Sequence, residues 1–254
     1  MTHVGEHAAS PGVELRADRV AAGYGDVMIL HEVSLFVRPG ELIALLGPTG
    51  AGKTTLLRAI AGLLPIRRGE IRLGEARLDE LPPHRIARLG LATLPEGRRL
   101  FDELSVAENL AMGAYSPAAR GQAREVRARV EQLFPVLADR RQASVGHLSA
   151  GEQQMVALGR ALMASPRCLL LDDPFLGLAP ALRRRLAPLL RELADTHGLA
   201  ILAAGQHART LLGVAHRGYV LEAGRVLASG PGPALIDDPE TRRTLLDFRR
   251  EARA

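Results

Sequence analysis

Residues 47–55 read GPTGAGKTT and match the pattern G-x-x-x-x-G-K-[ST]. Glycines at this spacing let the backbone turn tightly around an anion, so that successive N–H groups and the start of a helix face phosphate oxygens. The Lys53 ammonium would neutralise the outer phosphates of a nucleoside triphosphate, and the Thr54 hydroxyl would bind Mg²⁺. The sequence therefore predicts a phosphate-binding loop made of Gly47, Pro48, Thr49, Gly50, Ala51, Gly52, Lys53, Thr54 and Thr55.

Two adjacent carboxylates, Asp172 and Asp173, follow the apolar run CLLL and come directly before a proline. A Mg²⁺ held by a threonine hydroxyl also needs a carboxylate ligand, and Asp172 at the end of a buried strand suits that role. Asp173 is then placed to polarise an attacking water. The two motifs together predict a nucleotide-hydrolysing site with Thr54 and Asp172 on the metal.

The elements that must position these residues are visible in the same stretches. Residues 42–46 form an apolar run that predicts a buried strand, and the apolar rhythm of KTTLLRAIAGLL predicts a helix directly after the glycine-rich loop. Among 33 lysines and arginines the chain has a single lysine, Lys53. A position that keeps lysine while arginine stands everywhere else needs a compact ammonium, which a planar guanidinium does not imitate.

The bulk composition limits the fold and the partners. The 254 residues, 47% of them apolar, allow one substantial core or two small subdomains that share one, after a loose tail over residues 1–12. The sequence offers no signal-peptide pattern and no apolar run of eighteen residues, and its one cysteine, Cys168, lies inside an apolar run. We expect a soluble, cytosolic chain. The net charge of +5 comes from scattered arginines without interleaved aromatics, so we expect a solvated surface and no nucleic-acid partner.

The segment LSAGEQQMVALGRALMASPRCLLLDDP, residues 148–174, resembles the signature-to-Walker-B block of the ATP-binding cassette (ABC) ATPases. In that family the signature completes the nucleotide site of the opposite subunit. The resemblance implies ATP and Mg²⁺ as ligands, and a contact in trans with the γ-phosphate by Ser149, Ala150, Gly151 and Glu152. It also implies that Tyr24 stacks on adenine, that Glu96 in the Q-loop approaches the metal, and that Gln206 is the switch residue.

The resemblance also implies an architecture and a set of partners. It predicts an α/β P-loop NTPase of the ABC ATPase type: a RecA-like catalytic lobe over residues 13–97 and 165–254, with an antiparallel β edge, and a helical subdomain over 98–164. PEGRRLF, GLAP and RGYVLEAGRV look like the smaller ATPase subunit of branched-chain amino-acid importers, and relatives for urea or short amides share these motifs. Such a subunit works at the inner face of the membrane with a second ABC ATPase subunit and permease subunits, and indirectly with a solute-binding protein.

Several positions depart from the family pattern. Asp173 replaces the usual glutamate and is shorter by one C–C bond, roughly 1.5 Å, which suggests slow hydrolysis. Phe175 stands where serine or threonine is usual, and it either reshapes the dimer seam or packs inside. Ala150, Gly205 and His207 are further departures. Three functions stay open: an active transporter ATPase, which is favoured; a weakly hydrolysing partner in a heterodimer; and a cassette acting on DNA or ribosomes, which is disfavoured because such proteins carry long coiled coils or two fused cassettes.

Overall fold

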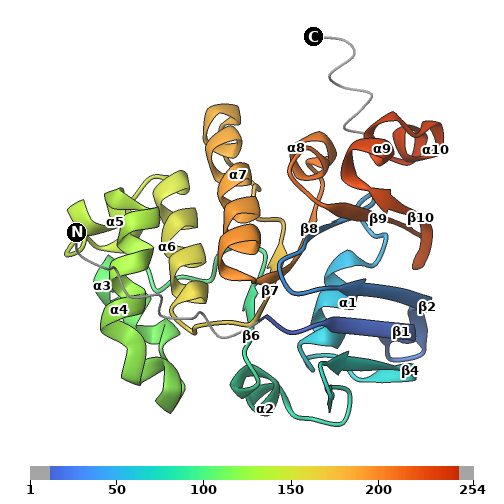
Figure 1. Cartoon of the computed structure of the whole chain (residues 1–254), viewed down its shortest axis with the longest axis horizontal. Coiled ribbons are helices and arrows are strands. Elements are labelled where there is room, and N and C mark those ends of the chain that lie inside the picture. The colour runs from blue at the N-terminus through green and yellow to red at the C-terminus, as the bar shows by residue number, and fades with distance from the viewer. Residues whose placement is uncertain (1–11, 246–254) are drawn as a thin grey trace, which may run out of the picture.

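The computed structural model describes residues 12–245 (Figure 1). The predicted tail lies outside the described residues except for Gly12. The strands are β1 (Leu15–Tyr24), β2 (Val27–Val37), β3 (Leu42–Leu46), β4 (Ile66–Leu73), β5 (Ala76–Arg77), β6 (Leu91–Leu94), β7 (Cys168–Asp172), β8 (Ala200–Gly205), β9 (Arg217–Glu222) and β10 (Arg225–Pro231). The helices are α1 (Lys53–Ile60), α2 (Pro83–Arg88), α3 (Val106–Gly113), α4 (Pro117–Leu133), α5 (Pro135–Asp139), the 3-10 helix η1 (Val145–His147), α6 (Ala150–Leu162), α7 (Pro180–His197), α8 (Ala208–Leu212), α9 (Gly232–Asp237) and α10 (Pro239–Thr244).

The central sheet has six strands in the order β10-β9-β3-β8-β7-β6, and all neighbours are parallel except β9 and β10. Every residue of β3 is buried, as expected for a parallel strand covered on both faces. In register, Leu46 pairs with Gly205 and Asp172 pairs with Ala204. The carboxyl ends of β3, β7 and β8 therefore meet at one edge of the sheet, where α/β proteins bind their ligands.

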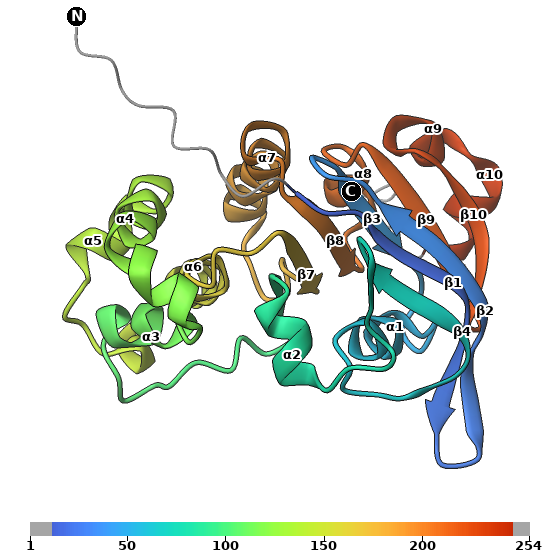
Figure 2. The same cartoon turned by 60° about the horizontal axis from the view of Figure 1, so that its bottom comes forward.

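The N-terminal strands form a second sheet, in the order β2-β1-β4-β5, in which all pairings are antiparallel (Figure 2). The predicted antiparallel edge is present, because β10 lies antiparallel to β9 at the edge of the central sheet. The N-terminal antiparallel strands bond to one another and make a sheet of their own. Register shifts in β1, between Ala17 and Val20 and again near Ala22, bend this sheet along its length.

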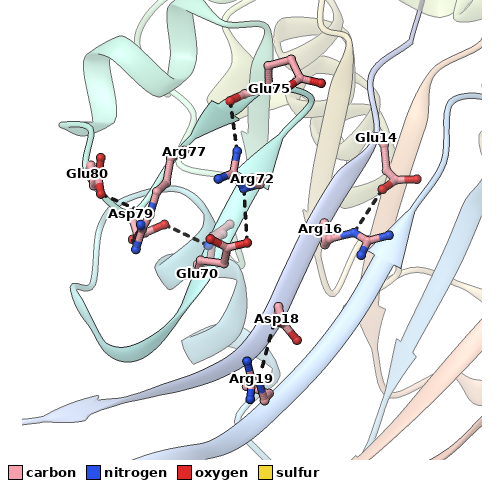
Figure 3. Close-up of polar contacts among 11 residues, drawn as sticks. Glu14, Arg16, Asp18, Arg19, Glu70, Arg72, Glu75, Arg77, Asp79 and Glu80 are labelled. Carbon is pink, nitrogen blue, oxygen red and sulfur yellow. Dashed lines mark hydrogen bonds and ion pairs between the residues drawn. The ribbon is translucent and has the colours of Figure 1, made fainter.

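Arginines of the second sheet form ion pairs with nearby carboxylates. Figure 3 shows Arg16 beside Glu14, Arg72 beside Glu70, and Arg77 between Asp79 and Glu80, with nitrogen–oxygen distances of 3.1–3.3 Å. Exposed pairs of this kind contribute little to stability. Each of these arginines has a carboxylate beside it, so its positive charge is balanced locally.

The helices α3 to α6 lie together on one side of the molecule, apart from α1 and the antiparallel sheet, in both overall views (Figures 1 and 2). The apolar stripe of α4 and α5 faces inward: Val130, Phe134 and Leu137 are at most 2% exposed, and Val126 and Leu133 pack against the same core. The stripe is therefore core and does not form a partner surface.

The side chains of β3 alternate between two hydrophobic cores, as a strand period of two requires. Leu42, Ala44 and Leu46 belong to the core shared with α3 to α8, whereas Ile43 and Leu45 belong to the core under α1 and the antiparallel sheet. Because β3 packs into both cores, the start of the loop that follows it is held in place. Among residues 12–245 no helix is both long and apolar enough to cross a membrane.

Candidate functional site: a phosphate-binding loop beside paired carboxylates

The glycine-rich loop leaves β3 and ends at the first residue of α1. Gly52 is the N-cap of α1 with φ of +104°, and no side chain caps the helix. The first-turn N–H groups therefore face the loop without an internal partner. At Gly47 a Cβ atom would lie 2.2 Å from the Leu221 carbonyl oxygen, so a larger residue would displace the loop. This uncapped helix start within a glycine turn fits a polyphosphate.

Lys53 is held over the loop by backbone carbonyl groups. Its Nζ donates hydrogen bonds to the oxygens of Gly47 at 2.7 Å and Pro48 at 3.0 Å. Burial lowers the pKa of Lys53, while the charges of Asp173, Asp172 and Glu96 act in the opposite direction. The one lysine of the chain thus lies among three carboxylates, which leaves a net negative site that favours a metal cation.

Thr54 and Asp172 meet across the sheet edge. Thr54 Oγ1 donates to Asp172 Oδ1 at 3.1 Å, which joins the first turn of α1 to the end of β7. Burial raises the pKa of Asp172; the bond from Thr54 opposes this, and the neighbouring carboxylates of Glu96 and Asp173 add to it. A hydroxyl and a carboxylate oxygen side by side are a suitable pair of ligands for Mg²⁺.

Asp173 has a left-handed backbone, with φ of +49°. Its N–H donates to the Ala204 carbonyl at 2.8 Å, and its Oδ2 accepts from Gln206 Nε2 at 3.2 Å. Burial raises the pKa of Asp173, while the charges of His207 and Lys53 and the bond from Gln206 lower it. The structure thus brings together the two residues that the sequence predicts to be catalytic.

The predicted signature residues occupy the start of α6. Ser149 is the N-cap: its Oγ accepts from Glu152 N at 3.3 Å, and Ser149 N donates to Glu152 Oε2 at 2.8 Å. Hydrogen bonds from Ser149 lower the pKa of Glu152. Ala150 and Gly151 follow in the first turn. In Figure 1 α6 lies with the helical group, whereas α1 lies beside the antiparallel sheet, so the described chain does not bring these residues to Lys53.

Tyr24 ends β1 and is 43% exposed. Its hydroxyl accepts a hydrogen bond from Arg58 Nη1 at 3.1 Å, which connects the strand to the outer side of α1. Glu96 lies in the loop after β6 and is exposed. It acts on Lys53, Asp172 and Asp173 through its charge.

The sequence and the fold were compared with known proteins. The family described as "ABC transporter" matches residues 30–176. The chain belongs to the ABC transporter family. Over 232 residues it is 40% identical to the high-affinity branched-chain amino acid transport ATP-binding protein BraG of Pseudomonas aeruginosa, covering 91% of this chain and 99% of BraG.

Two further relatives of the family frame the range of activities. The probable branched-chain amino acid transport ATP-binding protein LivF of Archaeoglobus fulgidus is 33% identical, covering 88% of this chain and 94% of LivF. The lipopolysaccharide export system ATP-binding protein LptB of Acidithiobacillus ferridurans is 37% identical, covering 91% of this chain and 96% of LptB. A solved nucleotide-free ATP-binding cassette from an ABC transporter shares the fold, with a TM-score of 0.80, 24% identity, and 93% and 98% coverage.

The protein is thus an ABC ATP-binding subunit of a transporter, and it resembles the branched-chain amino-acid proteins in particular. Proteins of this family bind ATP, generally with Mg²⁺, and the family implies ATP hydrolysis. The uncapped start of α1 and the pair Thr54–Asp172 are the candidate contacts for such a ligand.

The departures from the family pattern now have places in the structure of this ABC subunit. Phe175 is 1% exposed and belongs to the main core, so it packs inside. Gly205 ends β8, where a Cβ atom would lie 2.9 Å from Leu211 Cδ1 and 3.6 Å from Asp173 Oδ1. His207 is the N-cap of α8, and its ring nitrogens lie 2.6 and 3.1 Å from Arg183 Nη1.

The sequence reasoning missed Arg98 in this ABC subunit. Its guanidinium donates to the side chains of Gln153 and Gln154 on α6, each at 3.0 Å. The signal that could have found it is a pair of arginines, Arg98 and Arg99, one glycine after Glu96, together with two adjacent glutamines in the helix that begins at the signature.

A groove of about 380 Å³ borders the helical group of α3 to α6, and we call it the groove between the lobes after the predicted division of the chain. It lies between α2 and β6 on one side and α3 and α6 on the other. Arg160 lines it, with its guanidinium carbon 5.9 Å from the centre of the Phe101 ring. Burial lowers the pKa of Arg160. The groove also holds the exposed apolar side chains of the region: Leu63, Phe101, Met112 and Tyr115.

Proposed function

We propose that this protein is the ATP-hydrolysing subunit of an importer for branched-chain or related amino acids, working at the inner face of the membrane through permease subunits. The observation that carries the nucleotide chemistry is the contact of Thr54 Oγ1 with Asp172 Oδ1 at 3.1 Å, next to Lys53 and the uncapped helix start. The 40% identity to BraG over nearly the whole of both chains supports amino-acid import.

Each residue has a defined task in this proposal. Lys53 and the first-turn N–H groups of α1 bind the β- and γ-phosphates, and Tyr24 presents its exposed ring to adenine. Thr54 and Asp172 hold Mg²⁺ with Glu96 near it, and the bound ion neutralises charge that develops on the phosphates. Asp173 accepts a proton from the attacking water, and Gln206 orients the carboxylate through its hydrogen bond.

Two cassettes complete the site. Ser149 and Ala150 are exposed at the start of α6, where a helix N-terminus favours an anion. These residues lie with the helical group and away from Lys53 of the same chain. We propose that they meet the γ-phosphate bound to a second ABC subunit, in a head-to-tail dimer.

The groove between the lobes is the proposed contact with the permeases. Phe101 and Met112 are 48% and 54% exposed there, beside the partly buried cation of Arg160. A single chain rarely leaves several large apolar side chains exposed around one hollow, and such a patch is typical of a protein interface.

A second candidate is a nucleotide-binding partner with weak turnover in a heterodimer. The short Asp173 favours it, because the displacement of a catalytic group by about 1 Å can lower the rate on the order of 10²-fold. The direction of transport is a separate alternative, because the lipopolysaccharide export system protein LptB is 37% identical to this chain.

The first test is calorimetric titration of the purified protein with ATP and Mg²⁺. We expect one site per chain, and we expect Lys53→Ala to lower the affinity at least tenfold. Arg124→Ala, an exposed change on α4, is the control and should bind as the native chain does. If the native protein bound ATP·Mg²⁺ no more tightly than Lys53→Ala does, the proposed nucleotide site would be contradicted.

The second test is transport. The protein is combined with its permease subunits in lipid vesicles, and ATP is supplied either outside or inside the vesicles. The movement of labelled leucine, urea and lipopolysaccharide across the vesicle membrane is then measured. ATP-dependent leucine entry supports the proposal. Movement of another solute, or movement in the opposite direction, contradicts amino-acid import while leaving the nucleotide site intact.

A further inference from the structure

We propose that Arg98 is a positioning residue that fastens the loop after β6 to the signature helix α6 and to the segment after Asp173. The expected effect of Arg98 on ATP turnover rests on the proposed ATPase function, whereas the fastening of the loop to α6 does not. Arg98 Nε donates to Gln154 Oε1 and Nη1 donates to Gln153 Oε1, both at 3.0 Å. One planar guanidinium thus bridges two adjacent side chains of α6.

The backbone of Arg98 is held by the other end of the same helix. Its carbonyl oxygen accepts from Arg160 Nη2 at 2.9 Å, and Arg160 lies in the last turn of α6. Arg98 has φ of +61°, an uncommon conformation for a non-glycine residue. Strain of this kind persists where surrounding contacts fix the backbone, and here α6 supplies contacts from both of its ends.

The third contact leads to the turn that follows Asp173. Arg98 Nη2 lies 3.5 Å from the Leu176 carbonyl oxygen, and Leu176 N donates to the Asp173 carbonyl at 3.1 Å. A Cβ atom on Gly177 would lie 3.5 Å from the same Nη2 atom. The guanidinium therefore touches the turn that follows Asp173 as well as α6.

The partners of Arg98 need its donors. Gln154 is 6% exposed, and its Oε1 atom would lose its charged donor if Arg98 were truncated. An unsatisfied buried acceptor is costly, so the first turns of α6 would rearrange. Lysine at position 98 would present a single compact ammonium on a flexible stem and would not bridge both glutamines with one planar group.

Arg98 also connects to the groove between the lobes. Arg160, which holds the Arg98 backbone, lines that groove beside Phe101. A permease segment in the groove would press on Arg160, and the displacement would reach Gln153 and Gln154 through Arg98. Arg98 thus joins the proposed partner surface to the signature helix α6 and to the turn after Asp173.

Hydrogen–deuterium exchange of the nucleotide-free protein tests the fastening without any assumption about catalysis. In Arg98→Ala we expect amide exchange in residues 151–155 and 174–178 to be about tenfold faster. Arg99→Ala is the matched control, because Arg99 is its exposed neighbour with a similar φ of +49°. Unchanged exchange in Arg98→Ala, or equal acceleration in Arg99→Ala, would overturn the proposal.

Steady-state hydrolysis tests the kinetic role. We expect Arg98→Ala to leave the Kd for ATP·Mg²⁺ within twofold and to lower kcat about tenfold; Arg98→Lys should fail to restore kcat. The double variant Arg98→Ala/Gln154→Ala should be no slower than either single variant. Normal kcat in Arg98→Ala, or full rescue by lysine, would overturn the kinetic role. If the native protein binds no ATP, the proposed function fails, and the exchange result still decides the fastening.

Discussion

Gln206 Nε2 donates a hydrogen bond to Asp173 Oδ2 over 3.2 Å, which joins the residue after β7 to the residue after β8. The two strands are neighbours in the parallel sheet, so the contact follows from their register. The bond fixes one oxygen of a short carboxylate. We expect the other oxygen, Oδ1, to be the one that accepts a proton from an attacking water.

Lengthening the Asp173 side chain should speed hydrolysis. We expect Asp173→Glu to raise kcat about tenfold or more, because the carboxylate gains roughly 1.5 Å of reach. ATP affinity should change by less than threefold, since Asp173 is not a proposed metal ligand. Phosphate release at saturating ATP measures kcat. Asp173→Asn is the control and should bind ATP without hydrolysing it. An unchanged kcat in the glutamate variant would exclude reach as the limiting factor.

Replacing Asp172 by asparagine should stabilise the nucleotide-free protein. Burial raises the pKa of Asp172 above its unfolded value, so the protonated form favours folding and stability is lost as pH rises through the folded pKa. Asparagine is neutral and can still accept from Thr54. At pH 7 we expect the Tm of Asp172→Asn to rise by about 1–3 °C, with weaker ATP·Mg²⁺ binding.

Thermal melting at pH 7 and pH 4 measures this effect. The difference between Asp172→Asn and the native protein should shrink at pH 4, where more of the native carboxylate is protonated. Asp139→Asn, at the exposed end of α5, is the control and should leave Tm unchanged. A lower Tm for Asp172→Asn at pH 7 would contradict the prediction.

The strand bounds at 42–46 follow directly from the sequence, because LIALL is a short apolar run between Glu41 and Gly47. The loop beside Lys53 follows as well, because its glycine spacing has few other uses. The burial of Phe175 does not follow from the sequence. A phenyl ring two residues after Asp173 can face solvent or the core, and only the packing of the folded chain decides between them. The guanidinium of Arg98 meets glutamines 55 and 56 residues away, and no local pattern encodes that distance.

Stability should depend on pH through Glu41, which precedes β3. Burial alone would raise the pKa of Glu41, but bidentate hydrogen bonds from Arg217 at 2.8 and 3.2 Å, a bond from Arg38 N and their charges lower it overall. A lowered pKa contributes stability above the unfolded value, and that stability is lost as pH falls through the folded value.

Glu41→Gln should therefore lower the free energy of unfolding at pH 7 by roughly 0.5–1.5 kcal/mol. The loss should become smaller as pH falls below about 4.5, the unfolded value. Urea unfolding at pH 7 and pH 3.5 measures the difference. Glu222→Gln, at the exposed end of β9, serves as the control and should change little. A loss that grows toward low pH would contradict the sign.

A carboxylate placed in the groove between the lobes should block the permeases without affecting ATP. Met112 is 54% exposed on α3, and covering this exposed half at an interface contributes about 1 kcal/mol, while an aspartate in its place would also have to be desolvated. Met112→Asp should therefore weaken binding to the permeases in lipid nanodiscs by roughly ten- to a hundredfold, whereas calorimetric ATP·Mg²⁺ affinity stays within twofold. Arg124→Asp, an exposed change on α4 outside the groove, should bind the permeases normally. Native permease affinity in Met112→Asp would move the proposed interface to another face of the protein.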